Sequence, residues 1–372
     1  MVRRKLLFVS AILIAALCAT NARADVLIGL AAPITGKNAW FGEQLERGAA
    51  QAVADANAAG GVLGQQVQLV TADDACDPEQ AVAAAKKLVS DGVIFVVGHM
   101  CSGAAVPASE IWAAAGILMI SPMAMNPILT ELGRANVFRL AHRDEATAIA
   151  AGNYLADHWS DKNIAILHDD TLFGISVAEL TKEQLNRRGL TEALYLAYVA
   201  GKVNYGAEID QLQAADIAVA FIGGYHTEIG LMARHARDRG YPLQWVATTL
   251  GTEEFGLIAG DAAEGALFID QPDPRGNPEA GSVVERFRAS GYEPEHFTLY
   301  AYGAVQVWAQ AAEKAGSLEL PAMIAALRQY QFDTVLGPID FDDKGDLAVQ
   351  NPAWWVWRGG TYMPLEQDTA KK

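Results

Sequence analysis

The sequence predicts an α/β protein of two similar lobes, each with a parallel-sheet core. First, short apolar segments rich in β-branched residues alternate with longer, alanine-rich segments of helical period. Such alternation with short links indicates parallel strands joined by right-handed crossovers. Second, the alternation breaks at an irregular, charged segment, residues 138–144, and then restarts. Third, about 350 residues remain without the leader described below, more than one hydrophobic core usually supports.

The first half of the chain holds one series of strands and helices. A Gly-Gly pair at residues 60–61 is a helix stop signal, and Asp77-Pro78 combines an N-cap with proline at the first helical position. The expected strands are residues 26–30, 67–71, 93–97 and 117–120, and the expected helices are residues 43–59, 79–90 and 104–114.

The second half repeats the pattern and then becomes mainly helical. A connector rich in proline and glycine, residues 271–278, predicts a second passage between the lobes. Before it, the expected strands are residues 164–167, 195–199, 217–222, 244–246 and 266–269, and the expected helices are residues 145–159, 175–188, 207–213 and 227–239. After it, the expected helices are residues 282–289, 300–314 and 321–330, followed by a strand at residues 353–357.

The chain begins like an exported protein. A basic cluster at residues 3–5 precedes an apolar run at residues 6–17, and Ala22-Arg23-Ala24 follows. This is the pattern of a cleaved secretory signal peptide, with cleavage expected after Ala24, and the apolar run is too short to span a bilayer. A lipid anchor through Cys18 is the weaker interpretation, because Ala15 stands where such signals usually carry a larger aliphatic residue.

The charge balance excludes some partners. The chain has 28 Lys and Arg against 44 Asp and Glu. Without the four basic residues of residues 1–24, 24 remain against 44, a formal charge of −20. Such an acidic protein is not expected to bind nucleic acid or to insert into a membrane, and we expect a soluble monomer.

Two cysteines remain after cleavage, Cys76 and Cys101. An even pair in an exported protein favours a disulfide. His99 beside Cys101 is better explained by that disulfide than by a metal site, since no motif with metal-ligand spacing occurs. We expect neither a metal nor a cofactor.

Ser102 is the strongest candidate for a ligand contact from position alone. It lies between the end of the strand at residues 93–97 and the start of the helix at residues 104–114. Ligands of open α/β sheets bind at such junctions, where free N–H groups and the helix dipole favour a carboxylate. The alternative is that Ser102 is only an N-cap.

No catalytic motif is complete. Gly36-Lys37 lacks the other residues of a phosphate-binding loop, and Ser102 is not flanked by the glycines of a nucleophile elbow. A dinucleotide-binding glycine pattern is also absent from the sequence. The sequence therefore predicts a binding protein and not an enzyme.

Four motifs carry a family resemblance. They are Asp-Asp-Ala-Cys-Asp-Pro at residues 73–78, Gly-His-Met-Cys-Ser at 98–102, Gly-Gly-Tyr-His at 223–226 and Val-Leu-Gly-Pro at 335–338. In one register, they closely resemble the leucine/isoleucine/valine-binding proteins, the periplasmic solute receptors of ABC importers. The resemblance implies a type I periplasmic-binding-protein fold, about three hinge crossings and a Cys76–Cys101 disulfide. It implies one lobe of residues 25–143 plus 272–350 and a second of residues 144–271 plus 351–372.

The resemblance also implies a ligand site in the interlobe cleft. The ligand carboxylate would lie against Ser102 and backbone N–H groups near three successive residues. Apolar and aromatic side chains would form the walls, which suits a small apolar acid. The residues near the carboxylate are Met123, Ala124 and Met125, and the walls are Phe41, Met100, Cys101, Phe173, Tyr225 and Phe297.

Two positions depart from the family pattern. Met125 replaces a threonine that binds the ligand carboxylate, and Thr249 replaces the acidic residue that pairs with the ligand ammonium. Because a buried, unpaired ammonium costs several kcal/mol, either a nearby carboxylate such as Glu253 or Glu254 substitutes, or the ligand lacks an ammonium.

The expected function is therefore capture of a branched-chain or similar apolar amino acid for a membrane permease of an ABC importer. A ligand without an ammonium, such as an aromatic, fatty or keto acid or a small amide, is the first alternative. A periplasmic ligand sensor for a signalling partner is the second. An enzyme such as an amidase is disfavoured, because no activated nucleophile is recognised.

Overall fold

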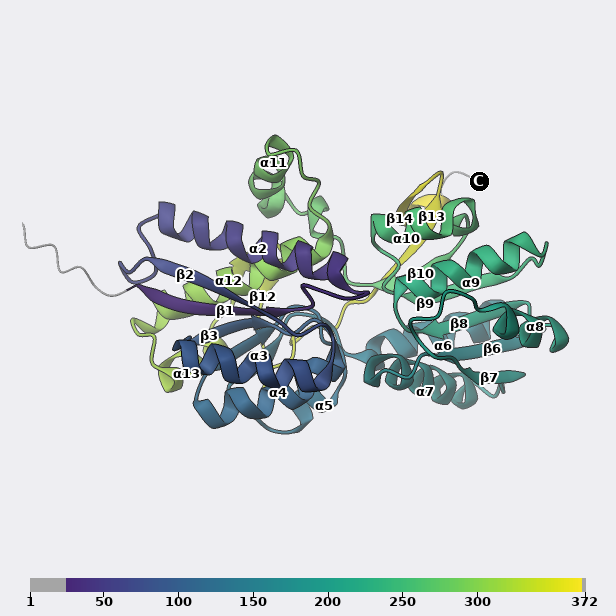
Figure 1. The fold of residues 1–372 in the computed structure, drawn as a ribbon, viewed down its shortest axis with the longest axis horizontal. Helices are drawn as coiled ribbons and strands as arrows, with labels where there is room; N and C mark the ends of the chain where they lie inside the picture. Colours follow the sequence, from purple (N-terminus) through teal and green to yellow (C-terminus); the bar gives the residue numbers. More distant parts are fainter. Residues whose placement is uncertain (1–24, 370–372) are drawn as a thin grey trace, which may run out of the picture.

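The computed structural model describes residues 25–369, so the expected signal peptide lies outside the described residues. Two β-sheets form the cores of two lobes that lie side by side (Figure 1). Within the described range, no helix has the length and apolar character needed to cross a membrane.

The first lobe contains a parallel sheet of five strands in the order β2-β1-β3-β4-β5. Figure 1 shows α2 on one side of this sheet and α3 and α4 on the other, and α12 packs along α2. The strands are β1 (Val26–Ala32), β2 (Val67–Asp73), β3 (Phe95–Gly98), β4 (Leu118–Ser121) and β5 (Val137–Arg139). The helices are α2 (Ala39–Ala58), α3 (Pro78–Asp91), α4 (Ser102–Ala115), α5 (Ile128–Glu131), α12 (His296–Ala315) and α13 (Leu320–Gln329).

The second lobe contains a mixed sheet of seven strands in the order β14-β13-β10-β9-β8-β6-β7. The strands from β10 to β7 are parallel, and β13 and β14 extend the sheet as antiparallel strands. The strands are β6 (Ile164–His168), β7 (Leu194–Ala197), β8 (Val219–Gly223), β9 (Gln244–Thr248), β10 (Leu267–Asp270), β13 (Ala353–Arg358) and β14 (Thr361–Pro364). The helices are α6 (Asp144–His158), α7 (Leu172–Arg187), α8 (Gly206–Ala214), α9 (His226–Asp238), α10 (Glu253–Ala259) and α14 (Leu365–Thr369).

The chain passes between the two sheets three times, after β5, after β10 and before β13. The first two passages are in contact: the backbone N–H of His142, in the first, donates a hydrogen bond of 3.1 Å to Oε1 of Gln271, in the second. The short η2 (Gly260–Ala263) lies before β10 in the second lobe. The second passage leads into η3 (Pro274–Gly276), η4 (Pro278–Ala280) and α11 (Gly281–Ala289), and the third follows β11 (Phe332–Thr334) and β12 (Gly337–Ile339).

The expected series of strands and helices is present, but its boundaries and its shortest elements differ. The segment expected to be irregular at residues 138–144 contains part of β5, whose three residues are too few to show a period. The helix expected from residue 300 starts at His296, which places Phe297 in its first turn. β14 and the β11–β12 hairpin were not predicted, since each is three or four residues long.

A network of buried polar groups holds the end of β3 against the loop after β2. Oδ2 of Asp74 lies 2.7 Å from Nδ1 of His99, and Oδ1 of Asp74 accepts a hydrogen bond of 2.9 Å from the N–H of Cys76. Cys76 and Cys101 form the expected disulfide, with their Cα atoms 5.4 Å apart. Gly98 has a φ of 147°, and a Cβ there would lie 2.4 Å from the carbonyl oxygen of Ala31, so only glycine fits. This network holds Ser102 in place.

Replacing both cysteines, Cys76→Ala with Cys101→Ala, is expected to lower the free energy of unfolding by on the order of 3 kcal/mol, because the closed loop spans 25 residues. Denaturant unfolding measures the change. Reducing agent is expected to destabilise the wild type by a similar amount and to leave the double variant unaffected. Equal stability of the wild type and the double variant would contradict a stabilising cross-link.

Candidate functional site

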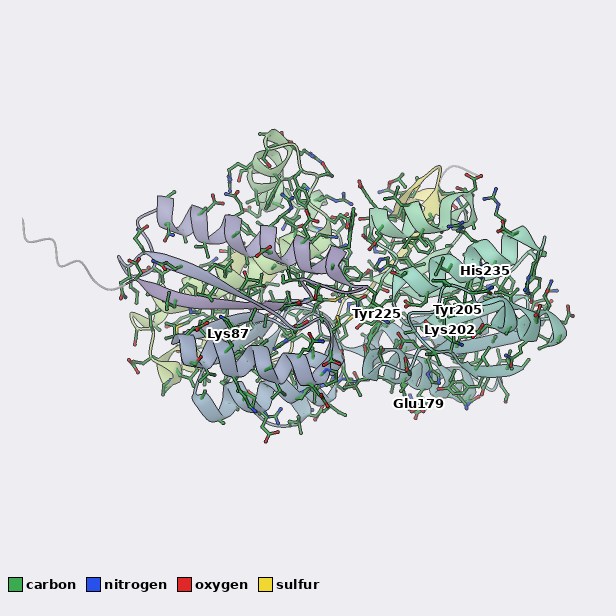
Figure 2. All side chains as sticks on the ribbon, viewed as in Figure 1. Lys87, Glu179, Lys202, Tyr205, Tyr225 and His235 are labelled. Carbon is green, nitrogen blue, oxygen red and sulfur yellow. A yellow bond between two sulfur atoms is a disulfide. The ribbon has the colours of Figure 1, made fainter. Side chains whose placement is uncertain are left out.

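A small cavity lies where the two lobes meet, at the carboxyl ends of their parallel strands. About 300 Å³ of space lies among its lining residues, part of it open to solvent, so the lobes leave little enclosed room between them. Tyr225, one of its walls, lies at the junction of the lobes in Figure 2. The lining residues are Met100, Ser102, Met123, Met125 and Phe297 from the first lobe, and Phe173, Tyr225, Thr249 and Asp270 from the second.

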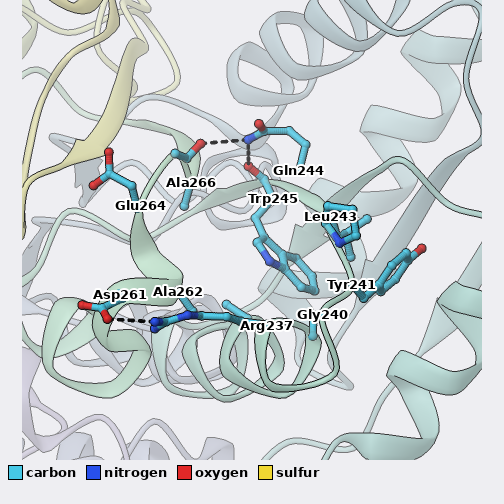
Figure 3. A pocket seen from close by; sticks show the side chains of 14 residues that line it. Arg237, Gly240, Tyr241, Leu243, Gln244, Trp245, Asp261, Ala262, Glu264 and Ala266 are labelled. Carbon is cyan, nitrogen blue, oxygen red and sulfur yellow. Dashed lines mark hydrogen bonds and ion pairs between the residues drawn. The ribbon is translucent and has the colours of Figure 1, made fainter.

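A second hollow lies far from this junction, between α9, η2 and the start of β9 (Figure 3). The space among its lining residues is larger, about 680 Å³, part of it open to solvent. However, its charged pair is already bonded, since Arg237 and Asp261 lie 2.8 Å apart, and the amide of Gln244 donates to the carbonyl oxygen of Gly265. Its position at the amino ends of the strands also argues against a ligand site, because ligands of parallel sheets bind at the carboxyl ends.

Ser102 is the first residue of α4, so it lies beside the positive end of that helix. Its Oγ accepts a hydrogen bond of 3.2 Å from the N–H of Asn126, which fixes the loop after β4 against the helix. In that loop the N–H of Ala124 donates to Oγ of Ser121 and is therefore already used, and Ala124 does not line the cavity. The sulfur of Met125 accepts from the Gln271 amide at 3.3 Å.

Aromatic rings form the apolar walls. The rings of Phe173 and Tyr225 have centroids 5.5 Å apart, and those of Phe41 and Phe297 have centroids 4.5 Å apart. Phe41 is fully buried behind Phe297 and does not line the cavity, and neither does Cys101. Burial raises the pKa of Tyr225 well above its usual value, so the ring carries a neutral hydroxyl.

Thr249 brings no charged group to the cavity. Oγ1 of Thr249 donates a hydrogen bond of 3.0 Å to the carbonyl oxygen of Gly224. Glu254 lies 2.6 Å from Nε2 of His226, and the N–H of Glu253 points to the first lobe. Neither of these glutamates lines the cavity.

Asp270, the last residue of β10, lines the cavity and was missed by the sequence analysis. The expected strand ended at residue 269 and the connector began at residue 271, so the aspartate between them was assigned no role. A usable signal was nevertheless present, since Asp270 is an acidic residue directly after a buried apolar strand, at the same sheet edge as Thr249.

Several contacts join the lobes around the cavity. The buried carboxylate of Glu295, in the first lobe, accepts hydrogen bonds from Oγ1 of Thr252 at 2.9 Å and from the N–H of Glu253 at 2.6 Å, at the start of α10 in the second lobe. On its own lobe it accepts from Trp40 and Gln44. This carboxylate therefore binds the amino end of a helix in the opposite lobe, where negative charge is favourable.

Two further contacts cross the gap. Nζ of Lys37 lies 3.4 Å from Glu228, and Nδ2 of Asn126 donates to the carbonyl oxygen of Leu172 at 3.4 Å. The structure thus has the lobes in contact on more than one side of the cavity.

Comparison with known proteins agrees with this architecture. Residues 25–359 match the family model described as periplasmic binding protein. A Leu/Ile/Val-binding protein homolog of Brucella abortus is 43% identical over 339 residues, 91% of each chain. The crystal structure of a leucine binding protein of Thermotoga maritima has a TM-score of 0.84 at 24% identity and covers 91% of this chain and 97% of that chain. A branched-chain amino acid transporter substrate binding protein of Streptococcus pneumoniae, in complex with isoleucine, has a TM-score of 0.81 at 25% identity and covers 91% and 97%.

Replacing Glu295→Gln is expected to favour an open arrangement of the lobes. The variant loses the negative charge at the start of α10, and a hydrogen bond to a charged group contributes about 1.5 kcal/mol or more. The population of the open form relative to the closed form therefore rises roughly tenfold. Small-angle X-ray scattering checks this as an increase in the radius of gyration.

The matched control is Glu293→Gln, which removes the same charge two residues away, where Glu293 pairs with Arg288 within the first lobe. It is expected to scatter like the wild type. Identical scattering by the Glu295 variant and the wild type would contradict the role of this carboxylate in closure.

Proposed function

Because the chain belongs to the periplasmic binding protein family, we propose that it is the solute-binding component of an ABC importer and that it captures a branched-chain or similar apolar amino acid between its lobes. The predicted resemblance and the predicted type I fold are confirmed by the comparisons. The observation that carries the proposed function is the small interlobe cavity, which combines a helix-start serine with aromatic walls.

The cavity matches the parts of such a ligand. Ser102 and the first N–H groups of α4, which have no acceptor within the helix, suit a carboxylate. The aromatic and methionine walls suit a branched aliphatic side chain. A ligand that touches residues of both lobes stabilises their closure, because it binds the closed form better than the open one.

The remaining parts of the proposal follow from this role. The protein is exported to the periplasm after cleavage of the leader at Ala24, and it acts as a monomer whose closed form is recognised by a membrane permease. Its lobes are residues 25–143 plus 272–350 and residues 144–271 plus 351–372. The proposed role is binding and not catalysis, since among residues 25–369 Oγ of Ser102 accepts a hydrogen bond from the backbone N–H of Asn126 and has no base bonded to it.

One observation favours a ligand without an ammonium as the second candidate. Thr249 brings no charge, its hydroxyl is bonded to Gly224, and Met125 brings no hydroxyl. A keto acid or an aromatic acid has no ammonium and needs no charge at position 249, although its carboxylate, like that of an amino acid, would find no hydroxyl at position 125.

A panel of ligands separates the two candidates by thermal shift. Leucine, isoleucine and valine are expected to raise the melting temperature, since a ligand at 100 times its Kd stabilises the folded state by about 2.7 kcal/mol. The corresponding keto acids, benzoate and small amides are expected to have much smaller effects. A shift with keto acids and none with amino acids would overturn the first candidate.

Replacing Ser102→Ala is expected to weaken binding of the ligand by roughly tenfold or more, because a hydrogen bond to a charged carboxylate contributes about 1.5–3 kcal/mol. Isothermal titration calorimetry measures the change. Ser90→Ala is the matched control, since Ser90 lies on α3 and its hydroxyl donates to the carbonyl oxygen of Lys87. Equal affinities of the wild type and the Ser102 variant would show that Ser102 is only part of the helix start.

A further inference from the structure

Asp270 is the only acidic side chain among the residues that line the interlobe cavity in the described part of the chain. The residue is buried, with 4% of its surface exposed. Its Oδ1 accepts a hydrogen bond of 2.7 Å from the N–H of Gln271, whereas its Oδ2 accepts none from any residue between 25 and 369. A buried carboxylate oxygen without a hydrogen bond is costly and calls for a partner.

Strand register places Asp270 beside the position that departs from the family pattern. β9 and β10 are parallel neighbours, and Ile269 pairs with Thr248. Asp270 and Thr249 are the next residues along each strand, at the same edge of the sheet. In addition, a Cβ at Gly251 would lie 3.4 Å from Oδ2 of Asp270, so this oxygen borders the loop that starts at Thr249. An acidic group is thus present one strand away from the expected position.

His296 supplies a positive neighbour from the first lobe. Its Nε2 lies 3.5 Å from Oδ2 of Asp270. Burial lowers the pKa of His296, but the carboxylates of Asp270, Asp273 and Glu295 together outweigh burial, and the pKa is raised above its usual value. The distance is long for a hydrogen bond, so Oδ2 retains the capacity to accept one from a ligand.

Three other carboxylates near the lobe junction are less suitable. Burial raises the pKa of Asp144 to about 7, which disfavours its charged form, and Asp144 does not line the cavity. Asp169 also has an Oδ2 without a hydrogen bond, but it does not line the cavity. Glu254 is bonded to His226.

We propose that Asp270 receives the α-ammonium group of the ligand, in place of an acidic residue at position 249. This inference rests on the proposed function and narrows its ligand class to apolar α-amino acids, as opposed to acids or amides that lack an ammonium. The ligand carboxylate then lies at Ser102 in the first lobe and its ammonium at Asp270 in the second, so that the two charges of one zwitterion bind opposite lobes.

The test compares Asp270→Asn with the wild type by calorimetry, using leucine and 4-methylpentanoate, which is leucine without its ammonium. The variant is expected to bind leucine about 100-fold more weakly or worse, because it leaves a buried ammonium without a counter-charge. It is expected to bind 4-methylpentanoate as well as the wild type does, or better. Leucine binding by the variant at wild-type affinity would overturn the proposal.

Asp144→Asn is the matched control, since it makes the same change at a buried carboxylate that does not line the cavity, and asparagine resembles the protonated form that burial favours. It is expected to bind leucine like the wild type. The wild type alone gives a second measurement should Asp270→Asn not fold: equal affinity for leucine and 4-methylpentanoate would also overturn the proposal. Wild-type protein that binds none of leucine, isoleucine and valine would instead overturn the proposed function.

Discussion

The site depends on one constraint, which is that the carboxyl ends of two parallel sheets face each other across a narrow gap. Parallel strands bring all their carboxyl ends to a single edge, so each sheet can present several loop residues to one point. Ser102 follows β3, and in the opposite sheet Thr249 follows β9 and Asp270 ends β10. Neither lobe contains all the residues that line the cavity, so the proposed site is complete only when both edges meet.

Charged side chains that become buried where the two sheet edges meet also need hydrogen-bond partners. Glu295 accepts hydrogen bonds from both lobes, and the Lys37–Glu228 pair adds a weaker, partly exposed contact. These contacts are charge-assisted, and they hold the lobes together only as long as both partners are in place. These polar contacts accompany ring contacts between the lobes, since the ring centroid of Phe41 in the first lobe lies 4.7 Å from that of His226 and 6.4 Å from that of Tyr225 in the second.

The architecture was largely predictable from the sequence because strands and helices carry local signals. Buried strands such as β3 and β8 read as apolar runs, and Asp77-Pro78 and the left-handed Gly92 mark the ends of α3. Of the walls expected from the family resemblance, Met100, Phe173, Tyr225 and Phe297 line the cavity, whereas Phe41 and Cys101 do not. Asp270 and Glu295 were not predicted, since their roles depend on contacts with residues distant in sequence. The expectation that Glu253 or Glu254 could replace the missing acidic group had the same weakness, because no local pattern shows that Glu254 bonds to His226.

The position of the acidic group has a consequence for how binding and closure are coupled. An ammonium held by Thr249 alone would have no counter-charge, so a zwitterion would gain little from the second lobe. With Asp270 as its partner, the ligand carries one charge for each lobe, and the favourable energy of the second contact is available only on closure. A ligand that lacks the ammonium can fill the apolar walls and contact Ser102, but it gives the second lobe no charged group to bind. The protein then distinguishes ligands with an ammonium from ligands without one in the closing step. A ligand shifts the equilibrium between the open and closed forms only by the difference in its affinity for the two forms.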